Sequence, residues 1–325
     1  MIVITGGAGM IGSMIAWHLN ENLGRDDVVV VDRFEHQDQW QNLCHRKLAD
    51  ILDKDELPAW LGKVGKVDAI IHMGAISATT ERDFNRLLAT NIRYSQGLWN
   101  WCAERSVPFL YASSAATYGG GEWGYDDSHD IDALRPLNGY GYSKHYFDQW
   151  ALRCQREGMP CPPHWYGFKY FNVFGPNEYH KGRMASVAFH TFNQVTEHGR
   201  MKLFRSHRNG YADGMQMRDF VYVKDAAKAT SHFISTTAPS GLYNIGTGKA
   251  RAFLDLASAV MRNMDRSPEI DFVDTPEDLR GKYQYFTEAN VSKLRAAGYN
   301  ADFMELEDAV ADYVRNYLMQ EDPYC

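Results

Sequence analysis

The sequence lacks the features of a membrane, secreted or nucleic-acid-binding protein. No apolar run in the 325 residues approaches the length of a membrane span. A glycine-rich turn begins at Gly6, which leaves no room for a cleavable leader. The 41 acidic and 34 basic residues give a net charge of −7, and no basic run could follow a phosphate backbone. We therefore expect a cytoplasmic protein that binds neither membranes nor nucleic acids.

Cysteine is scarce, and its pattern suggests neither disulfides nor a metal site. The five cysteines are odd in number and scattered, without a CxxC or a histidine-rich pattern. We interpret them as reduced thiols that mostly pack, and we predict no metal site. Repeats, low-complexity tracts and long linkers are also absent. With 45% hydrophobic residues, the chain can bury a large core in one large domain or two interlocked domains.

The first half of the chain alternates strand and helix patterns. The opening "MIVITGGAGMIGSMIAWHLNENLGRDDVVVVDRF" predicts a strand, a glycine turn, an amphipathic helix to about Leu19 and a strand ending at Asp32. Further strand-like runs cover 67–75, 107–115 and 164–175, with helix-length segments near 80–104 and 138–157. This alternation predicts an α/β fold with a doubly wound parallel (Rossmann) sheet covered on both faces.

After Gly175 the alternation becomes less regular. Short strands are expected at "MKLF", "RDFVYV", "GLYNIG" and "EIDFV", and helices near 184–198, 225–236, 252–264 and 305–318. We predict a dinucleotide-binding domain over 1–170, with returns near 219–244 and 285–300, and a smaller, mainly substrate-binding α/β domain over 171–325. Ligands of such sheets bind beyond the carboxyl ends of the strands, so we expect a cleft between the domains.

"TGGAGMIG" places Gly6, Gly9 and Gly12 between the first strand and the first helix. Glycine lets the backbone turn sharply and approach a pyrophosphate, whose charge then faces the helix N-terminus. Asp32 ends the next strand, 20 positions after Gly12, where a carboxylate accepts hydrogen bonds from ribose hydroxyls. The pattern predicts dinucleotide binding; the alternative is a tight structural turn.

Arg33 leaves the choice of dinucleotide open. Asp32 favours an unphosphorylated ribose, whereas the neighbouring guanidinium can pair with a 2′-phosphate. The alternative is that Arg33 is a surface residue with no ligand. The residues alone do not decide between NAD and NADP.

Serine, tyrosine and lysine converge on the same rim of the predicted sheet. "YASSAATYGG" places Ser113 and Ser114 at the carboxyl end of a strand, and "NGYGYSKHYFDQW" places Tyr140 and Lys144 on one helix face. Such a tyrosine can exchange a proton with a substrate alcohol while hydride moves to or from nicotinamide. A nearby ammonium lowers the tyrosine pKa, and the serine holds the reacting oxygen. The alternative is an aromatic packing stripe with a solvated lysine.

These motifs resemble those of the extended short-chain dehydrogenase/reductases that act on nucleotide sugars, although Met10 stands where phenylalanine is commoner. A likeness over nearly the whole chain is to the branch that epimerises ADP-heptose at C6″. It rests on "YASSAATYGG", "PLNGYGYSK", "YFNVFGPNEYHKGRMASVAFH", "RDFVYVKD", "YNIGTG" and "LRAAGY". The block "HKGRMASVAFH" is the most specific, because general nucleotide-sugar epimerases do not usually carry it.

The resemblance implies a role for individual residues. Tyr140 and Lys181 would be the two acid/base residues, Ser114 an oxyanion partner, and Lys144 the lysine that contacts the tyrosinate and the cofactor ribose. Besides Tyr140 and Lys144, the cofactor site would contain Gly6, Gly9, Met10, Ile11, Gly12, Asp32, Arg33, Lys54, Met73, Gly74, Ala75, Ile76, Ser77 and Asn91. Besides Ser114 and Lys181, the sugar nucleotide would contact Asn172, Arg183, Ser186, His190, Phe204, Arg205, Ser206, His207, Arg218 and Tyr283. In the alternative reading, Phe204 and Tyr283 only pack and Lys54 is solvated, whereas the guanidinium of Arg218 suits a diphosphate.

The resemblance further implies tightly bound NADP, with NAD as the alternative, an ADP-sugar substrate and a homo-oligomer, which we expect to be a pentamer. The product would supply heptose for the lipopolysaccharide core. A nucleotide-sugar 4-epimerase, a 4,6-dehydratase and a dinucleotide-sensing regulator are the alternatives. Dehydratases usually carry an Asp-Glu pair where this chain has Ala115 and Ala116, and such regulators tend to lose the tyrosine or the lysine.

The chain departs from the family pattern at three places. Arg183 stands where a small residue is frequent, and Lys169 stands where arginine is usual. The segment "RSHRNGYADGMQMRDF" is longer than the corresponding loop and is expected beside the nucleotide site. These departures leave the nucleotide base, the exact sugar and the role of 207–217 less determined than the reaction type.

Overall fold

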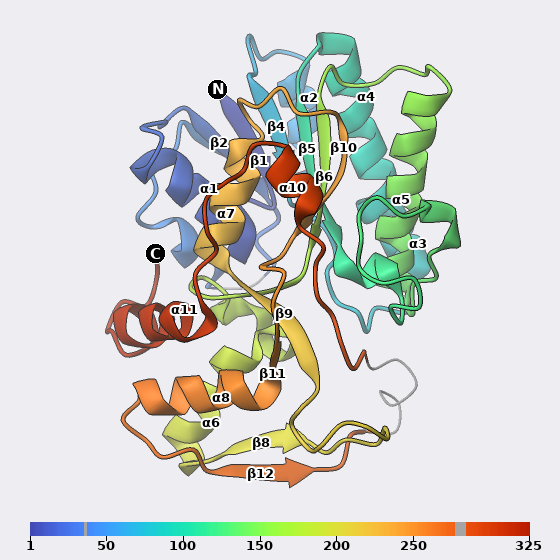
Figure 1. The fold of residues 1–325 in the computed structure, drawn as a ribbon. Coiled ribbons are helices and arrows are strands. Elements are labelled where there is room, and N and C mark those ends of the chain that lie inside the picture. Colours follow the sequence, from blue (N-terminus) through green and yellow to red (C-terminus); the bar gives the residue numbers. More distant parts are fainter. Residues whose placement is uncertain (36–37, 277–283) are drawn as a thin grey trace.

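The computed structural model describes residues 1–35, 38–276 and 284–325. Within these residues a seven-stranded sheet has the order β10-β6-β5-β4-β1-β2-β3, and each neighbouring pair is parallel (Figure 1). Its strands are β1 (Ile2–Thr5), β2 (Val28–Asp32), β3 (Asp50–Asp53), β4 (Ala69–His72), β5 (Phe109–Ser114), β6 (Trp165–Tyr170) and β10 (Gly241–Ile245). The predicted α/β fold with a parallel sheet is confirmed. The strand order reverses between β1 and β4, which is where such sheets bind their ligands.

Successive residues of each strand point to opposite faces, and helices cover both faces. On one face, Ile2 and Ile4 pack in the core that includes α1 (Met10–Glu21) and α7 (Val223–His232), which lie side by side in Figure 1. On the other face, Val3 packs in the core that includes α2 (Leu57–Leu61), α4 (Ser95–Arg105) and α5 (Gly139–Arg156). The short helix α3 (Phe84–Leu87) continues through a π-helical segment, Leu88–Tyr94, into α4.

The second region lies below the main sheet in Figure 1 and contains two small sheets among the described residues. In one, β9 (Met217–Tyr222) pairs with β7 (Asn172–Phe174) in parallel and with β11 (Ala250–Ala252) antiparallel. In the other, β8 (Met201–Phe204) and β12 (Ile270–Val273) pair in parallel. The accompanying helices are α6 (Val187–His198), α8 (Phe253–Asn263) and α11 (Leu306–Tyr313), whereas α10 (Ser292–Ala296) packs against β10 of the main sheet. None of the helices in the described part of the chain is long and apolar enough to cross a membrane.

The chain does not follow every expected element. The run 164–175 was expected to be one strand, but the structure divides it into β6 and β7, which belong to different sheets. Phe171 lies between them, buried, and its N–H donates to Ile245 O. The part of the chain after β7 does not belong to the second region alone. It returns to the main sheet as β10, and its helix α7 packs against α1. The division into domains at residue 170 stays a prediction.

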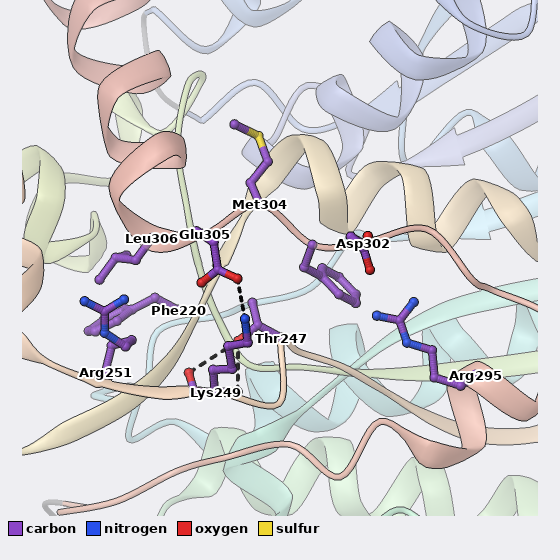
Figure 2. Close-up of a pocket in the computed structure, with 10 residues that line it drawn as sticks. Phe220, Thr247, Lys249, Arg251, Arg295, Asp302, Met304, Glu305 and Leu306 are labelled. Carbon is purple, nitrogen blue, oxygen red and sulfur yellow. Dashed lines mark hydrogen bonds and ion pairs between the residues drawn. The ribbon is translucent and has the colours of Figure 1, made fainter.

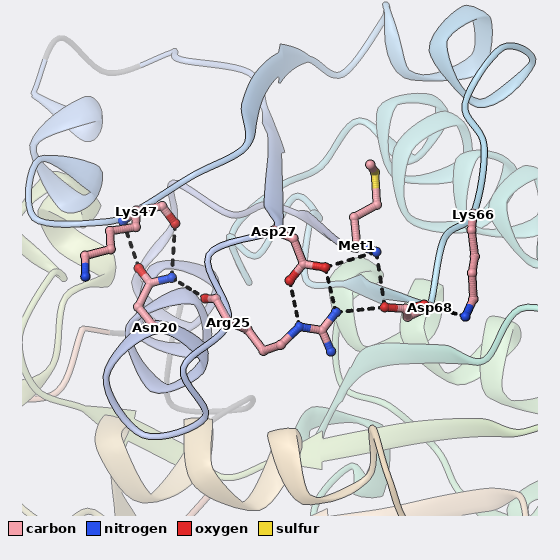
Figure 3. A network of polar contacts seen from close by, with 7 residues as sticks. All are labelled: Met1, Asn20, Arg25, Asp27, Lys47, Lys66 and Asp68. Carbon is pink, nitrogen blue, oxygen red and sulfur yellow. Dashed lines mark hydrogen bonds and ion pairs between the residues drawn. The ribbon is translucent and has the colours of Figure 1, made fainter.

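Charged groups join the amino ends of three strands of the main sheet (Figure 3). Arg25 donates to Asp27, which precedes β2, and to Asp68, which precedes β4. The amino group of Met1, immediately before β1, lies 3.2 Å from Asp27 and 3.1 Å from Asp68. The hydrogen bond from Arg25 lowers the pKa of Asp27. Burial raises the pKa of Asp68, but its bonds from Arg25 and Met1 leave that pKa below its ordinary value.

Candidate functional site

The turn between β1 and α1 fits only glycine at two positions. Gly6 has a φ of +64°, in the left-handed region, and a Cβ there would overlap the backbone of Gly74 in the loop after β4. A Cβ on Gly12 would overlap Gly6 O. The two loops at the carboxyl edge of the sheet are therefore in backbone contact.

This turn leaves the N-terminus of α1 open to an anion. Gly9 is the N-cap residue and supplies no side-chain cap, while the first intrahelical bond runs from Ser13 N to Gly9 O. The amides of Met10, Ile11 and Gly12 therefore have no partner within the helix. Such a helix N-terminus, closed in by glycine backbone, fits the pyrophosphate of a dinucleotide.

Asp32 lies beside this turn at the end of β2. Its carboxylate accepts hydrogen bonds from Ala8 N at 2.8 Å and Arg33 N at 2.7 Å, which leaves acceptor capacity for a ribose hydroxyl. Burial raises the pKa of Asp32, although these backbone bonds oppose the rise. The Arg33 side chain is exposed, 3.5 Å from Glu35. Lys54 follows β3, with Nζ 5.8 Å from the ring centroid of Tyr94.

The loop after β4 carries the predicted cofactor residues Met73, Gly74, Ala75, Ile76 and Ser77. Asn91 fixes this loop, because its amide exchanges hydrogen bonds of 2.9 and 3.0 Å with the backbone of Ile76. The same amide donates to Ser143 Oγ at 2.9 Å. Ser143 lies on α5, and its hydroxyl donates to Tyr140 O. Asn91 therefore couples the cofactor loop to the helix that carries the predicted acid/base residues.

Ser114, Tyr140 and Lys144 meet where β5 ends and α5 begins. Asn138 starts α5, since its side chain accepts a hydrogen bond from Gly141 N at 2.8 Å. The Ser114 hydroxyl is hydrogen bonded to Tyr140. Lys144 is buried one turn further along the helix, and its Nζ donates to Ala112 O at 2.7 Å. The predicted serine, tyrosine and lysine are thus brought together.

The surroundings of this trio set its protonation. Burial raises the pKa of Tyr140, and the hydrogen bond with Ser114 opposes the rise. Burial lowers the pKa of Lys144 to about 8, against the effect of Asp148, which raises it. Near neutral pH the site therefore holds a protonated tyrosine beside an ammonium group, which is the resting form of a proton-exchanging pair.

Lys181 reaches the N-terminus of α1 from the second region. It lies in the 3₁₀ segment Tyr179–Met184, and its Nζ is 3.7 Å from Met10 Sδ. Burial lowers the pKa of Lys181, opposed by the carboxylate of Glu178. Asn177 holds the segment in place, since its side chain donates to Ser13 Oγ on α1 at 3.0 Å. The second predicted acid/base residue thus lies beside the N-terminus of α1.

The other residues expected to contact the sugar nucleotide belong to the second region. Ser186 caps α6 and donates to Glu178 at 2.7 Å, and His190 lies on the same helix. Asn172 begins β7 and Arg183 follows Lys181, both with exposed side chains. Ser186 is thus engaged in fixing the segment that carries Lys181.

Phe204, Arg205, Ser206 and His207 follow one another where β8 ends. The His207 N–H donates to Tyr285 Oη at 3.0 Å, and Ser206 N donates to Asp213 at 2.8 Å. Within the longer loop, the guanidinium of Arg208 lies 5.5 Å from the Tyr285 ring.

Arg218 is buried in β9, donates to Met217 O and lies 5.3 Å from the Phe253 ring. Tyr283 lies outside the described residues. The substrate roles of these residues stay predictions.

A separate pocket of about 140 Å³ lies between Thr247, Lys249 and the segment 302–306 (Figure 2). Lys249 pairs there with Glu305 across the pocket, and Arg251 reaches Glu307. None of the predicted site residues in the described part of the chain lines this pocket. It is therefore distinct from the site at the carboxyl edge of the sheet.

Sequence reasoning missed the residues behind the trio, Asp148 and Lys169. Their side chains form a buried ion pair with an Nζ–Oδ2 distance of 2.8 Å. The spacing of Asp148, four positions after Lys144, was a usable signal, because residues at i and i+4 share a helix face. The unusual lysine at position 169 was a second signal.

The glycine turn on a parallel sheet and the serine, tyrosine and lysine at its rim define an enzyme of the nicotinamide-dependent, short-chain dehydrogenase type. Residues 2–246 match the model of the NAD dependent epimerase/dehydratase family, and the chain belongs to this family. Its cofactor is therefore a nicotinamide dinucleotide. The expected family resemblance is confirmed.

Relatives with curated names are similar over their full lengths. The chain is 50% identical to the ADP-L-glycero-D-manno-heptose-6-epimerase of Fusobacterium nucleatum, with 100% of each chain covered. It is 49% identical, again with 100% of each covered, to the enzyme of the same name from Nitratidesulfovibrio vulgaris. The crystal structure of the Helicobacter pylori ADP-L-glycero-D-manno-heptose-6-epimerase is similar with a TM-score of 0.81 and 25% identity, covering 97% of this chain and 95% of that one.

Proposed function

We propose that this protein inverts C6″ of ADP-D-glycero-D-manno-heptose to give ADP-L-glycero-D-manno-heptose. The choice of substrate rests on one observation. About half of all positions are identical, over full length, to those of two enzymes named for this sugar nucleotide. The reaction type is supported by the trio of Ser114, Tyr140 and Lys144 beside the glycine turn.

In the proposed reaction the protein moves protons while the bound nicotinamide dinucleotide supplies the hydride acceptor and donor. Tyr140 takes the proton of the C6″ hydroxyl, and Ser114 holds the same oxygen by a hydrogen bond. The Lys144 ammonium stabilises the tyrosinate, which offsets the rise that burial causes in the tyrosine pKa. The sugar is oxidised to a ketone and then reduced on its other face, so the reaction has no net redox change.

We propose Lys181 as the second acid/base residue. The two epimers hold their C6″ hydrogen in opposite configurations, so the end of the sugar must rotate between oxidation and reduction. Rotation moves the C6″ oxygen, and one base cannot serve both positions because proton transfer needs contact at about 3 Å. Burial lowers the pKa of Lys181, which suits proton transfer nearer neutral pH. The alternative is that Lys181 binds the diphosphate.

We favour NADP over NAD because the exposed guanidinium of Arg33 stands beside Asp32, where it can pair with a 2′-phosphate. Its contact with Glu35, at 3.5 Å between exposed side chains, is weak enough to exchange for a phosphate. The roles of the cofactor and substrate residues, the cytoplasmic location, the pentamer and the supply of lipopolysaccharide heptose stay predictions.

The proposal is tested by offering the purified protein ADP-D-glycero-D-manno-heptose, UDP-glucose and UDP-N-acetylglucosamine separately, and following epimer composition by NMR. We expect the ADP-heptose to approach a mixture of its C6″ epimers and the UDP-sugars to stay unchanged. Epimerisation of a UDP-hexose at C4, with the ADP-heptose untouched, would show that the substrate is wrong but the reaction class is right. The boiled protein is the control.

A further inference from the structure

A buried charge pair lies directly behind Tyr140 and Lys144. Asp148 on α5 has no solvent exposure, and Lys169 on β6 is 1% exposed. Lys169 Nζ lies 2.8 Å from Asp148 Oδ2 and also donates to Thr117 Oγ1 at 2.6 Å. Both charges are therefore hydrogen bonded, and each has its counter-charge in direct contact.

Asp148 connects the catalytic helix to the catalytic strand. It lies four positions after Lys144 and eight after Tyr140, so the three side chains share a helix face. Its carboxylate accepts hydrogen bonds from Tyr111 Oη at 2.9 Å and Ser113 Oγ at 2.6 Å, both on β5. Ser113 immediately precedes Ser114, so this contact fixes the strand end that presents the serine to Tyr140.

Stability alone gives little reason for such a pair. Removing two charges from water costs several kcal/mol per ion, and well-packed apolar residues often replace a buried ion pair without loss of stability. The position of the pair offers a different reason, because Asp148 stands one helical turn from the buried ammonium of Lys144.

Few charged groups act on Lys144. Burial lowers the pKa of Lys144 to about 8, and Asp148, on the same helix, opposes this fall. From β5 it meets the neutral carbonyl of Ala112. From β4, His72 is buried between Thr5 and Ser95, and burial lowers its pKa to about 3, so this ring is neutral at working pH.

The groups around Asp148 are also accounted for. Tyr111 and Ser113 face it from β5 as neutral donors, and Lys169 faces it from β6. His145, on the same helix, has its pKa lowered by burial, so it is neutral as well. Among the described residues, the negative charge that acts on Lys144 is therefore that of Asp148.

We propose that Asp148 is a positioning residue for the Tyr140–Lys144 pair: its carboxylate, balanced by Lys169, docks α5 on β5 and keeps Lys144 an ammonium ion. The catalytic consequence rests on the proposed function, since it assumes that Tyr140 and Lys144 exchange the substrate proton. Asp148 itself touches neither substrate nor cofactor.

The direct test is the titration of Lys144 in protein labelled with ¹³C at lysine Cε, whose Lys144 NMR signal is assigned by its loss in Lys144→Arg. The variants are Asp148→Asn, the double variant Asp148→Asn/Lys169→Met, and Lys169→Arg as the control that keeps the positive charge. We expect the Lys144 pKa to fall in both variants that lack the carboxylate, by about one unit in the double variant and by more in Asp148→Asn, where the charge of Lys169 is left uncompensated, and to stay unchanged in Lys169→Arg.

The double variant distinguishes an effect of the lost carboxylate on Lys144 from an effect of misfolding, because it leaves no unpaired charge in the interior. A folded double variant whose Lys144 titrates as in the wild type would overturn the proposal. Where the wild type epimerises ADP-heptose, the alkaline limb of kcat should move by the same unit to lower pH, with KM little changed. An inactive wild type would contradict the proposed function, but the Lys144 titration would still decide whether Asp148 sets this charge.

Discussion

At the scale of single residues, the proposed acid/base groups come from two regions of the chain. Tyr140 and Ser114 approach from the strand β5 and the helix α5, whereas Lys181 approaches the N-terminus of α1 from the segment after β7. Under the proposed function, two proton-exchanging groups that approach from different regions of the chain suit a substrate whose oxygen changes position between oxidation and reduction.

Substituting each base should affect one epimer more than the other. In single turnovers with oxidised cofactor, Tyr140→Phe should abolish cofactor reduction by one epimer of the ADP-heptose, and Lys181→Met reduction by the other. Each loss should be roughly hundredfold or more, because general acid/base catalysis contributes 10²–10⁴-fold. Absorbance of the reduced nicotinamide measures both rates.

Lys66→Met is the matched control for Lys181→Met, since Lys66 is exposed and precedes β4 at the amino ends of the strands, so it removes the same charge away from the candidate site. If Lys181→Met only weakens binding of both epimers alike, Lys181 is a diphosphate ligand and the two-base assignment is wrong.

At the scale of the element, the β1–α1 turn is where we propose that the pyrophosphate of the dinucleotide binds. The helix presents unpartnered amides only because the chain approaches through glycines, one of which contacts the loop after β4. Slow release of the cofactor also suits the proposed reaction, because the same cofactor molecule must take up hydride and return it in each turnover.

The wild-type protein should therefore purify with nicotinamide dinucleotide bound, and Gly12→Ala should purify without it. Alanine favours a helix by about 1 kcal/mol over glycine, but here its Cβ would overlap Gly6 O and distort the turn. The measurement is the dinucleotide released on denaturation, quantified by liquid chromatography.

Gly97→Ala is the control, because a Cβ on Gly97 in α4 meets open space. It should keep the cofactor and gain up to about 1 kcal/mol in unfolding free energy. A Gly12→Ala protein that retains a full complement of dinucleotide would contradict the assigned cofactor site.

The sequence predicts the elements with strong periodicity and misses those that depend on tertiary pairing. The glycine turn and α5 are recognisable because local chemistry defines them: backbone freedom in one case, helix spacing in the other. The edge strand β3, "DILD", has a short, half-polar pattern and becomes a strand only by pairing with β2. The split between β6 and β7 at Phe171 likewise depends on packing that the apolar run does not encode.

The candidate site was likewise predictable where residue spacing defines it and not where strand pairing does. Ser114, Tyr140 and Lys144 were predictable from spacing, and the structure brings them together. The partner of Asp148 was not predictable, because Lys169 is 21 residues further along the chain and reaches it only through the pairing of β5 with β6.

At the scale of the whole molecule, we expect the charges at the amino ends of the strands to affect stability and not chemistry. Arg25, Asp27 and Asp68 lie before β2 and β4, whereas the candidate site lies at the carboxyl ends (Figure 3). Their side chains are each about a third exposed, so solvent screens the ion pairs.

Arg25→Met should lower the unfolding free energy at pH 7 by roughly 1 kcal/mol, the upper range for an exposed pair. The folded-state pKa values of Asp27 and Asp68 are lowered, so their stabilisation is full above the unfolded-state pKa, about 3.9, and is lost as the pH falls below it. The difference between variant and wild type should therefore shrink below about pH 4. Urea denaturation at a series of pH values measures this.

The control for this experiment is Met in place of the exposed Arg82, which changes the net charge equally at another surface position. Equal effects of Arg25→Met and Arg82→Met at every pH would show that only net charge matters.

The central claim is that the protein inverts C6″ of an ADP-heptose by removing and returning the same hydride. The most direct measurement is turnover of ADP-D-glycero-D-manno-heptose in deuterium oxide, followed by ¹H NMR at C6″ of both epimers. We predict conversion to the L-glycero epimer with C6″ hydrogen retained, because hydride held by the cofactor does not exchange with solvent. Deuterium accumulating at C6″ would indicate proton abstraction and reprotonation, and would contradict the account.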